Sequence, residues 1–424
     1  MLALPTAVIE VDAGSFFAIV VIAAIASITV AAVPKHLAPP VVVVELLLGI
    51  VVGPEILGLA HSDEFIEFFS NLGLGMLFFF AGYEIDFERI KGLPMKLGGL
   101  GWLLSVALAY GIGGALAAAG IVLSFLYTGS AMATTAIGTL IPILRDNGEL
   151  KTKFGTYLLA AGGAGEFGPI LLVTLVLSTA NPLHESAILL GFVALAIAIA
   201  LVSVRSAGRS WAALERTLEA SSQLAVRITV VLVFGLVLLA SKLGLDLLLG
   251  GFVAGMITRA ALRGHEVSVF ESKLTAVGFG FFVPFFFITS GIEFDLAALG
   301  SVEAVAKLML FLVLFLVVRG TPAMLLYRSV LSARDRAALA FYSATELPLV
   351  VAITTIATET GNMKTSTAAG LVGAAMLSTL IFPFVGLALR KGQTDAGDEE
   401  GANPPDAGPS PLGEGPVAQP SPAA

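Results

Sequence analysis

Long apolar runs, separated by short polar segments, make up most of the chain up to residue 391. Thirteen of these runs are long enough for a helix to cross roughly 30 Å of hydrocarbon. They are residues 16–33, 40–59, 67–84, 97–118, 121–144, 154–179, 186–204, 223–242, 243–262, 273–293, 303–327, 337–358 and 366–389. The pattern predicts an all-α polytopic membrane protein with about 13 transmembrane helices.

Basic residues are divided unequally between the two sets of alternating loops. Eighteen Lys and Arg residues fall in one set, whereas the other set holds only Lys242 and Lys364. Because Lys and Arg accumulate in short cytoplasmic loops, the N-terminus is predicted outside and the C-terminus inside.

The two halves of the chain share short motifs in the same order. The matched segments are 45–49 with 246–250, 81–87 with 290–296, and 130–131 with 343–344. The paired spans are seven crossings apart, an odd number, so the halves enter the membrane in opposite directions. This predicts two inverted six-helix repeats of the kind found in secondary transporters.

Two spans at corresponding places carry helix-breaking residues. Residues 127–142 contain Gly, Pro and several hydroxyl residues, and residues 343–349 contain Glu346 and, two residues later, Pro348. Such residues at mid-membrane predict two broken crossing helices whose freed backbone groups face a common point. The alternative is a pair of proline-kinked helices whose Ser and Thr side chains bond back to the preceding turn.

Composition narrows the classes of function. The chain is 57% hydrophobic and 13% charged, against roughly a quarter charged in soluble domains. It has no cysteine, and none of its four histidines pairs at metal-ligand spacing. No Ser/His, HExxH or paired-aspartate set lies within the spans, so we expect neither an enzyme nor a bound cofactor.

The domain boundaries follow from the same patterns. We predict an extracellular segment at 1–15, a first repeat at 16–179, a linker with an amphipathic cytoplasmic segment at 180–222, a second repeat at 223–391, and a disordered acidic tail at 392–424. The tail has no strand followed by GxGxxG, so no appended nucleotide-binding domain is expected, and no nucleic-acid partner either.

Glu166 lies in the middle of the run 154–179, among four glycines and before Pro169. A carboxylate at that depth costs several kcal/mol and indicates function, although a permanently protonated structural glutamic acid is the alternative. Arg319 lies inside the eleventh span and needs a carboxylate or a water-filled cavity, with Glu166 and Glu346 as candidates, unless it reaches the inner interface.

Other acids lie at or near the ends of the spans. Glu84 and Glu293 end the third and tenth spans, and Glu45 lies early in the second. We interpret them as gating or structural acids.

Together, the residues 45–54, 77–86 and 285–293 and the broken fifth span resemble the monovalent cation:proton antiporter superfamily, which has the sodium/proton exchanger fold, and its bacterial cation:proton antiporter-2 members in particular. The resemblance implies a homodimer in the bacterial inner membrane, with a dimerisation domain and a moving core domain.

The resemblance also implies roles for individual residues. The family's essential aspartate falls on Glu166, the polar residue before it on Gly165, its hydroxyls on Thr134 and Thr135, and its core basic residue on Arg319. Replacement of the first acid is typical of electroneutral relatives. The expected function is exchange of Na⁺ or K⁺ for protons at Glu166. The alternatives are an inverted-repeat carrier of another solute, such as a bile-acid-type or anion carrier, and a channel or sensor of the same fold.

Overall fold

A computed structural model describes residues 11–34, 39–85, 87–176, 188–203, 205, 217, 222–243, 245, 247–262 and 267–391, and within these residues every regular element is a helix. The predicted acidic tail, most of the predicted amphipathic segment and the acids Asp86 and Asp246 lie outside this part of the chain.

The helices follow one another in the order α1 (Ala13–Ala32), α2 (Val41–Val52), α3 (Glu64–Glu84), α4 (Phe87–Ile90), α5 (Leu93–Ala118), α6 (Phe125–Met132), α7 (Ile137–Asp146), η1 (Glu149–Lys151), α8 (Lys153–Val176), the helix Ile188–Ser203, α10 (Leu224–Lys242), α11 (Leu247–Ala261), α12 (Ser268–Val277), η2 (Gly278–Phe282), α13 (Val283–Ile292), η3 (Ala297–Leu299), α14 (Val302–Leu326), α15 (Ala333–Ser343), α16 (Pro348–Glu359) and α17 (Thr365–Arg390).

Within the described residues, eight helices are long and apolar enough to cross a membrane, and four shorter apolar helices accompany them. Every run predicted from the sequence overlaps at least one helix in the described residues, although the run 40–59 is helical only over Val41–Val52. The count of 13 crossings, their direction and the inverted repeat stay predictions.

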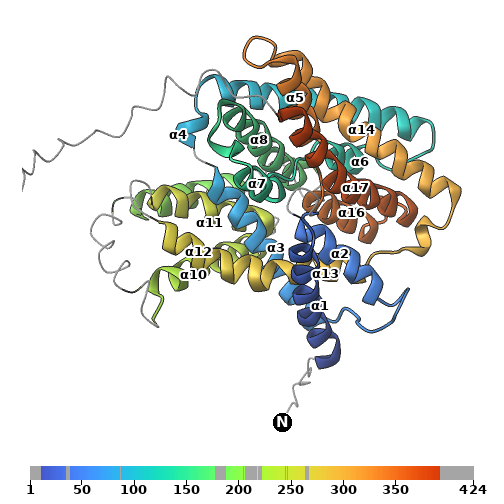
Figure 1. Ribbon diagram of the computed structural model, residues 1–424, viewed down its shortest axis with the longest axis horizontal. Helices are drawn as coiled ribbons and strands as arrows, with labels where there is room; N and C mark the ends of the chain where they lie inside the picture. Colours follow the sequence, from blue (N-terminus) through green and yellow to red (C-terminus); the bar gives the residue numbers. More distant parts are fainter. Residues whose placement is uncertain are drawn as a thin grey trace, which may run out of the picture.

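The helices pack in two groups that are visible in Figure 1. Helices α1 to α3 pack with α10 to α13, and α5 to α8 pack with α14 to α17. Each group therefore combines helices from both halves of the sequence, and the second group contains both broken helices.

Glycines allow the helices of the first group to approach closely. A Cβ on Gly82 of α3 would overlap the carbonyl oxygen of Phe252 on α11, and one on Gly255 would overlap that of Phe79. Gly251 and Gly255 form a GxxxG pair, the spacing that brings helix backbones together inside membranes. This contact is backbone on backbone, so it has no flexible side chain that could yield.

The two predicted breaks are present. The chain leaves the helical conformation between Met132 and Ile137, and again between Ser343 and Pro348. Pro348 opens α16 at its first position, where a missing N–H costs nothing. The alternative of continuous kinked helices is therefore wrong.

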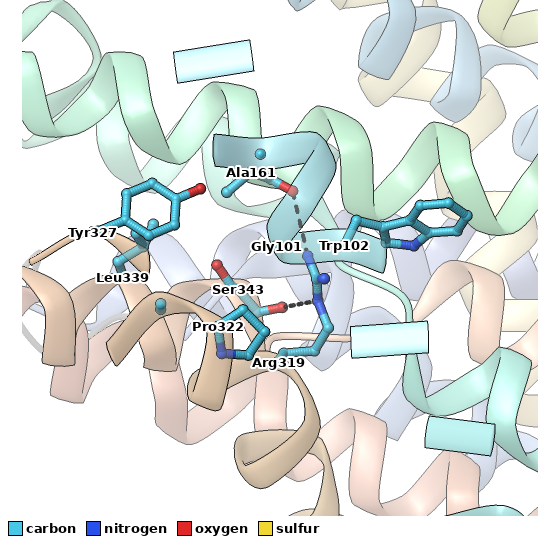
Figure 2. A pocket seen from close by; sticks show the side chains of 10 residues that line it. Gly101, Trp102, Ala161, Arg319, Pro322, Tyr327, Leu339 and Ser343 are labelled. Atoms are coloured by element: carbon cyan, nitrogen blue, oxygen red, sulfur yellow. Dashed lines mark hydrogen bonds between the residues drawn. The ribbon is translucent and has the colours of Figure 1, made fainter. Parts of the chain in front are cut away.

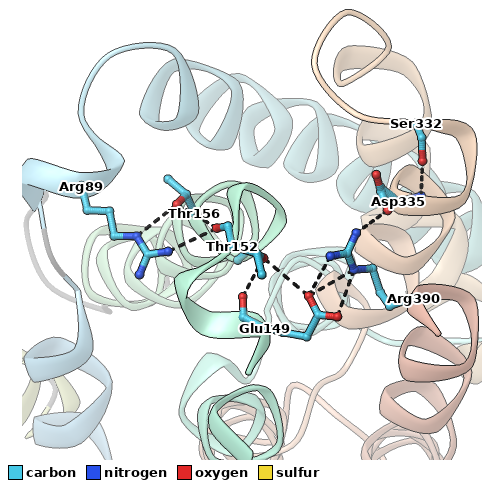
Figure 3. A network of polar contacts seen from close by, with 8 residues as sticks. Arg89, Glu149, Thr152, Thr156, Ser332, Asp335 and Arg390 are labelled. Atoms are coloured by element: carbon cyan, nitrogen blue, oxygen red, sulfur yellow. Dashed lines mark hydrogen bonds and ion pairs between the residues drawn. The ribbon is translucent and has the colours of Figure 1, made fainter. Parts of the chain in front are cut away.

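A buried ion network joins three elements of the second group at the end that carries most of the basic residues (Figure 3). Arg390, at the end of α17, contacts Glu149 of η1 at 2.9 Å and Asp335 of α15 at 2.6 Å. Its guanidinium also lies over the Phe154 ring, 4.5 Å from the centroid. One arginine at the end of α17 thus contacts η1, the start of α8 and the start of α15.

Candidate functional site

The two breaks lie against each other and against α8. The Thr135 backbone N–H donates to the Gly165 carbonyl oxygen (2.9 Å), and the next N–H, of Ala136, donates to the Thr345 carbonyl oxygen (2.8 Å). Since Glu166 and Glu346 directly follow these two acceptors, the first break runs between the two acids. These two backbone N–H groups of the first break thus have hydrogen-bond partners, as buried backbone groups require.

Glu166 lies on α8 and is 2% exposed. Its carboxyl group faces the N-terminus of α7, where the backbone amides of Ile137 and Gly138 interact with it. The first N–H groups of a helix have no partner within the helix and favour a negative charge. The Oε2 atom has no hydrogen-bond partner and remains available as a ligand.

Glu346 lies within the second break and is fully buried. Its backbone is held by α17: its N–H donates to Ser378 Oγ (3.0 Å), and the hydroxyls of Ser378 and Thr379 donate to its carbonyl oxygen (3.1 Å each). Neither carboxyl oxygen meets hydrogen-bond geometry, although Thr134 lies beside them. The carboxyl group therefore also faces the space between the breaks.

Arg319 of α14 is 4% exposed and points into the site rather than to the inner interface (Figure 2). Its Nε and Nη2 donate to Thr135 Oγ1 (3.0 and 2.7 Å), and its Nη1 donates to Ser105 Oγ (3.0 Å). Longer bonds reach the carbonyl oxygens of Ser343 and Ala161 (3.3 Å each).

All of these acceptors are neutral. Glu346 is near enough to Arg319 for an electrostatic interaction, yet the two form no ion pair within 4 Å, and none forms with Glu166. The hydrogen bonds of this buried guanidinium thus all go to hydroxyl and carbonyl oxygens. The carboxyl group of Glu346 acts on it only through a longer electrostatic interaction. Of the two partners that the sequence allowed for Arg319, a carboxylate or a water-filled cavity, direct pairing with a carboxylate is absent from this conformation.

Gly165 leaves room for that guanidinium. A Cβ at position 165 would overlap Arg319 Nη2 and lie 2.7 Å from Thr135 Oγ1. The space that a polar side chain before Glu166 would need is therefore filled by the cation of Arg319. The hydrogen-bonding capacity of the Thr135 hydroxyl is fully used, because it accepts from Arg319 and also donates to the Ser343 carbonyl oxygen (2.5 Å).

A small cavity adjoins Arg319 between α5, α8, α14 and α15 (Figure 2). It offers about 10 Å³ to the centre of a water molecule, enough for one water. Trp102 Nε1 and Tyr327 Oη, which lack hydrogen-bond partners, belong to residues that line it. Both can donate, so one water accepting from them would complete their bonding.

The structure brings together five of the eight site residues predicted from the sequence: Glu166, Thr134, Thr135, Arg319 and Glu346. The other three lie elsewhere. Glu45 is buried on α2 in the first group of helices, Glu84 is half-buried at the end of α3, and Glu293 is exposed after α13. Among the described residues no cluster of three or more Asp, Glu, His or Cys residues is placed to hold a metal ion.

Sequence reasoning missed Ser105, Ser378, Thr379, Tyr327 and Trp102. Single hydroxyl and aromatic residues in apolar helices carry no signal of their own. Only the packing of α5, α14 and α17 reveals that Ser378 and Thr379 bond to the second break and that Ser105, Tyr327 and Trp102 lie around Arg319.

A sequence model of the family described as "Sodium/hydrogen exchanger, transmembrane" matches residues 4–387, nearly all of the helical part. The chain belongs to this sodium/hydrogen exchanger family. It is 27% identical over 282 residues to the Na(+)/H(+)-K(+) antiporter GerN of Bacillus cereus, covering 63% of this chain and 68% of that protein. It is 24% identical over 286 residues to the probable Na(+)/H(+) antiporter 3 of Methanocaldococcus jannaschii, with coverages of 65% and 70%.

The fold agrees with this assignment. The solved sodium proton antiporter MjNhaP1 from Methanocaldococcus jannaschii superposes with a TM-score of 0.59 at 16% identity, covering 89% of this chain and 95% of that one. This exchanger-family protein is therefore a multi-pass membrane transporter and not an enzyme. Family membership also decides against the bile-acid-type and anion carriers.

Proposed function

We propose that this protein exchanges a monovalent cation for a proton at Glu166. The observation that carries the proposal is the buried carboxyl group of Glu166, which faces the N-terminus of α7 and keeps one oxygen without a partner. The printed names of the relatives, which describe Na(+)/H(+) antiporters, support the same exchange.

The exchange follows from competition for one charge. A cation bound at Glu166, or a proton on it, neutralises the carboxylate, and an uncompensated charge inside the membrane is costly. The core helices would then reorient only when one of the two ligands is bound. Thr134 and the oxygens of Glu346 offer further ligands of the kind that hard cations prefer.

The charges of the site favour an electroneutral cycle. Arg319 and Glu346 interact electrostatically, so that Glu346, when ionised, offsets the charge of Arg319. Gly165 adds no second carboxylate beside Glu166. One exchangeable negative charge remains, which corresponds to one monovalent cation for one proton.

Proteoliposomes that hold the purified protein test this proposal. An imposed pH gradient is dissipated by added Na⁺, Li⁺ or K⁺, and we expect Glu166→Gln to abolish the cation-dependent proton flux. Glu64→Gln, at the exposed start of α3, is the control and should retain it. Wild-type flux in the Glu166→Gln protein would refute the assignment.

Two further readouts address stoichiometry and transport class. A membrane potential alone should not drive exchange, and potential-driven transport would contradict the one-for-one cycle. Currents far above carrier turnover would indicate a channel. The homodimer implied by the resemblance stays a prediction, which mass measurement in detergent would test.

A further inference from the structure

An apolar groove lies between α14 and α15, outside the ion site. It encloses about 360 Å³. Its walls include Gly320, Thr321, Met324 and Leu325 of α14 and Ala340 and Phe341 of α15. The Thr321 hydroxyl donates to its own helix, to the Val317 carbonyl oxygen (2.6 Å), so it offers no free donor to the groove.

The groove is about as long as the hydrocarbon part of one lipid leaflet is thick. On α14 its wall extends from Leu316 to Leu325, about 14 Å at 1.5 Å per residue. Half of the roughly 30 Å hydrocarbon core is about 15 Å. An acyl chain lying along the groove would therefore extend from near the middle of the bilayer to its surface.

Two arginines meet at the surface end of the groove. Arg336 Nη1 donates to the carbonyl oxygen of Met324 (2.9 Å), and Arg328 Nε donates to the same oxygen (3.4 Å). Arg334 lies exposed in the first turn of α15. Positive charge is thus concentrated beside Met324, a residue of the groove wall.

This positive charge is not compensated by the protein. Within the described part of the chain, none of the three arginines forms an ion pair, and Arg336 Nε is buried without a hydrogen-bond partner. The acid between them in sequence, Asp335, is already bound by Arg390 at 2.6 Å. The two guanidinium groups on the Met324 carbonyl oxygen repel each other, and a bound anion would reduce this repulsion.

We propose that this groove binds an anionic phospholipid, with one acyl chain between α14 and α15 and the headgroup phosphate on Arg328, Arg334 and Arg336. Basic pockets between transmembrane helices recognise anionic headgroups in this way, and the loop charges assign this end to the cytoplasmic leaflet. A zwitterionic lipid fills the groove equally well but gains less at the arginines.

The position of the groove connects the lipid to the packing of the core. Gly320 lines the groove, and the preceding residue, Arg319, points into the ion site. A chain in the groove supports the contact between α14 and α15 at the turn that holds Arg319. Bound lipid should therefore raise the thermal stability of the protein.

The test measures lipid binding to the full-length protein in detergent, by native mass spectrometry and by the melting temperature. Phosphatidylglycerol should bind more tightly than phosphatidylcholine of the same chains and raise the melting temperature further. At about 1 kcal/mol for each arginine, the R328Q/R334Q/R336Q variant should lower the affinity for phosphatidylglycerol about 100-fold.

Two other variants make the test specific. K96Q/K151Q/K153Q removes three exposed lysines from the same set of loops, none of which lines the groove, and should retain the preference for phosphatidylglycerol. Ala337→Phe narrows the groove while keeping the arginines, and should weaken binding of both lipids.

Several outcomes would overturn the proposal. Equal binding of the two lipids by the wild-type protein would indicate ordinary surrounding lipid. An equal loss of affinity for phosphatidylglycerol in the lysine variant would indicate general attraction between positive protein charge and anionic lipid, without a specific site. Stabilisation by glycerol 3-phosphate alone would indicate a phosphate site that does not use the groove.

Discussion

Replacement of Gly165 by alanine would test whether Arg319 takes the place of a side chain before Glu166. The added Cβ would overlap Nη2 and approach Cζ to 3.0 Å. The guanidinium ends a flexible side chain and can move, but the adjoining cavity of about 10 Å³ is too small to receive it. Movement must therefore break its hydrogen bonds to Thr135.

The size of the effect follows from those bonds. Arg319 makes two to Thr135 Oγ1, at 3.0 and 2.7 Å. Hydrogen bonds to charged groups contribute about 1.5–3 kcal/mol each, and overpacking costs about 1–3 kcal/mol. Because the two bonds share one acceptor and are not additive, we expect Gly165→Ala to destabilise the protein by about 2–4 kcal/mol.

The assay is a double-mutant cycle on thermal stability in detergent, with Arg319→Met as the second change. In the Arg319→Met background Gly165→Ala should cost clearly less, because the guanidinium that it displaces is gone and only the 2.7 Å contact with Thr135 Oγ1 remains. Gly111→Ala on α5 is the matched control: its Cβ would meet no atom within 4 Å, so it should be neutral or stabilise by up to about 1 kcal/mol. Equal costs of Gly165→Ala in the two backgrounds would refute the reasoning.

Three further predictions concern the scaffold. Arg390→Met should destabilise the protein by about 3–5 kcal/mol, because it leaves the buried carboxylate of Asp335 and the half-buried one of Glu149 unpaired. The same change at exposed Lys153 should cost under about 0.5 kcal/mol, and similar melting temperatures of the two variants would contradict this. Gly82→Ala should separate α3 from α11, since its Cβ meets the Phe252 backbone, and should lower the yield of folded protein in size-exclusion chromatography; an unchanged elution profile would count against it. The Ser15 hydroxyl and amide donate to Asp12 and hold the pKa of that carboxyl below its ordinary value, so its stabilisation is present above the unfolded pKa and is lost as pH falls through the folded one. Hydrogen exchange in the first turn of α1 should accelerate below about pH 4 in the wild type, and Asp12→Asn should remove that step.

Local sequence determined the helices and the breaks of this protein. Apolar runs of sufficient length form helices in a membrane because every backbone group must be satisfied within the chain. The breaks were predictable because Pro348 and the hydroxyl-rich segment around Thr134 weaken the helix at their own positions. Glu166 was recognisable for a similar reason, since its depth in an apolar run can be read from the sequence and a charge at that depth is costly.

Only the tertiary structure decided how the charges are used. The sequence placed Arg319 at membrane depth and suggested a carboxylate partner, but the packing of α5, α8 and α14 supplies hydroxyl and carbonyl oxygens instead. Glu45, which the sequence placed early in the second span, lies buried in the other group of helices. Periodicity and composition specify where each helix begins and ends, whereas the neighbours of a side chain depend on contacts between residues far apart in the chain. The absence of a side chain at Gly165 is explained only by the guanidinium that occupies its place.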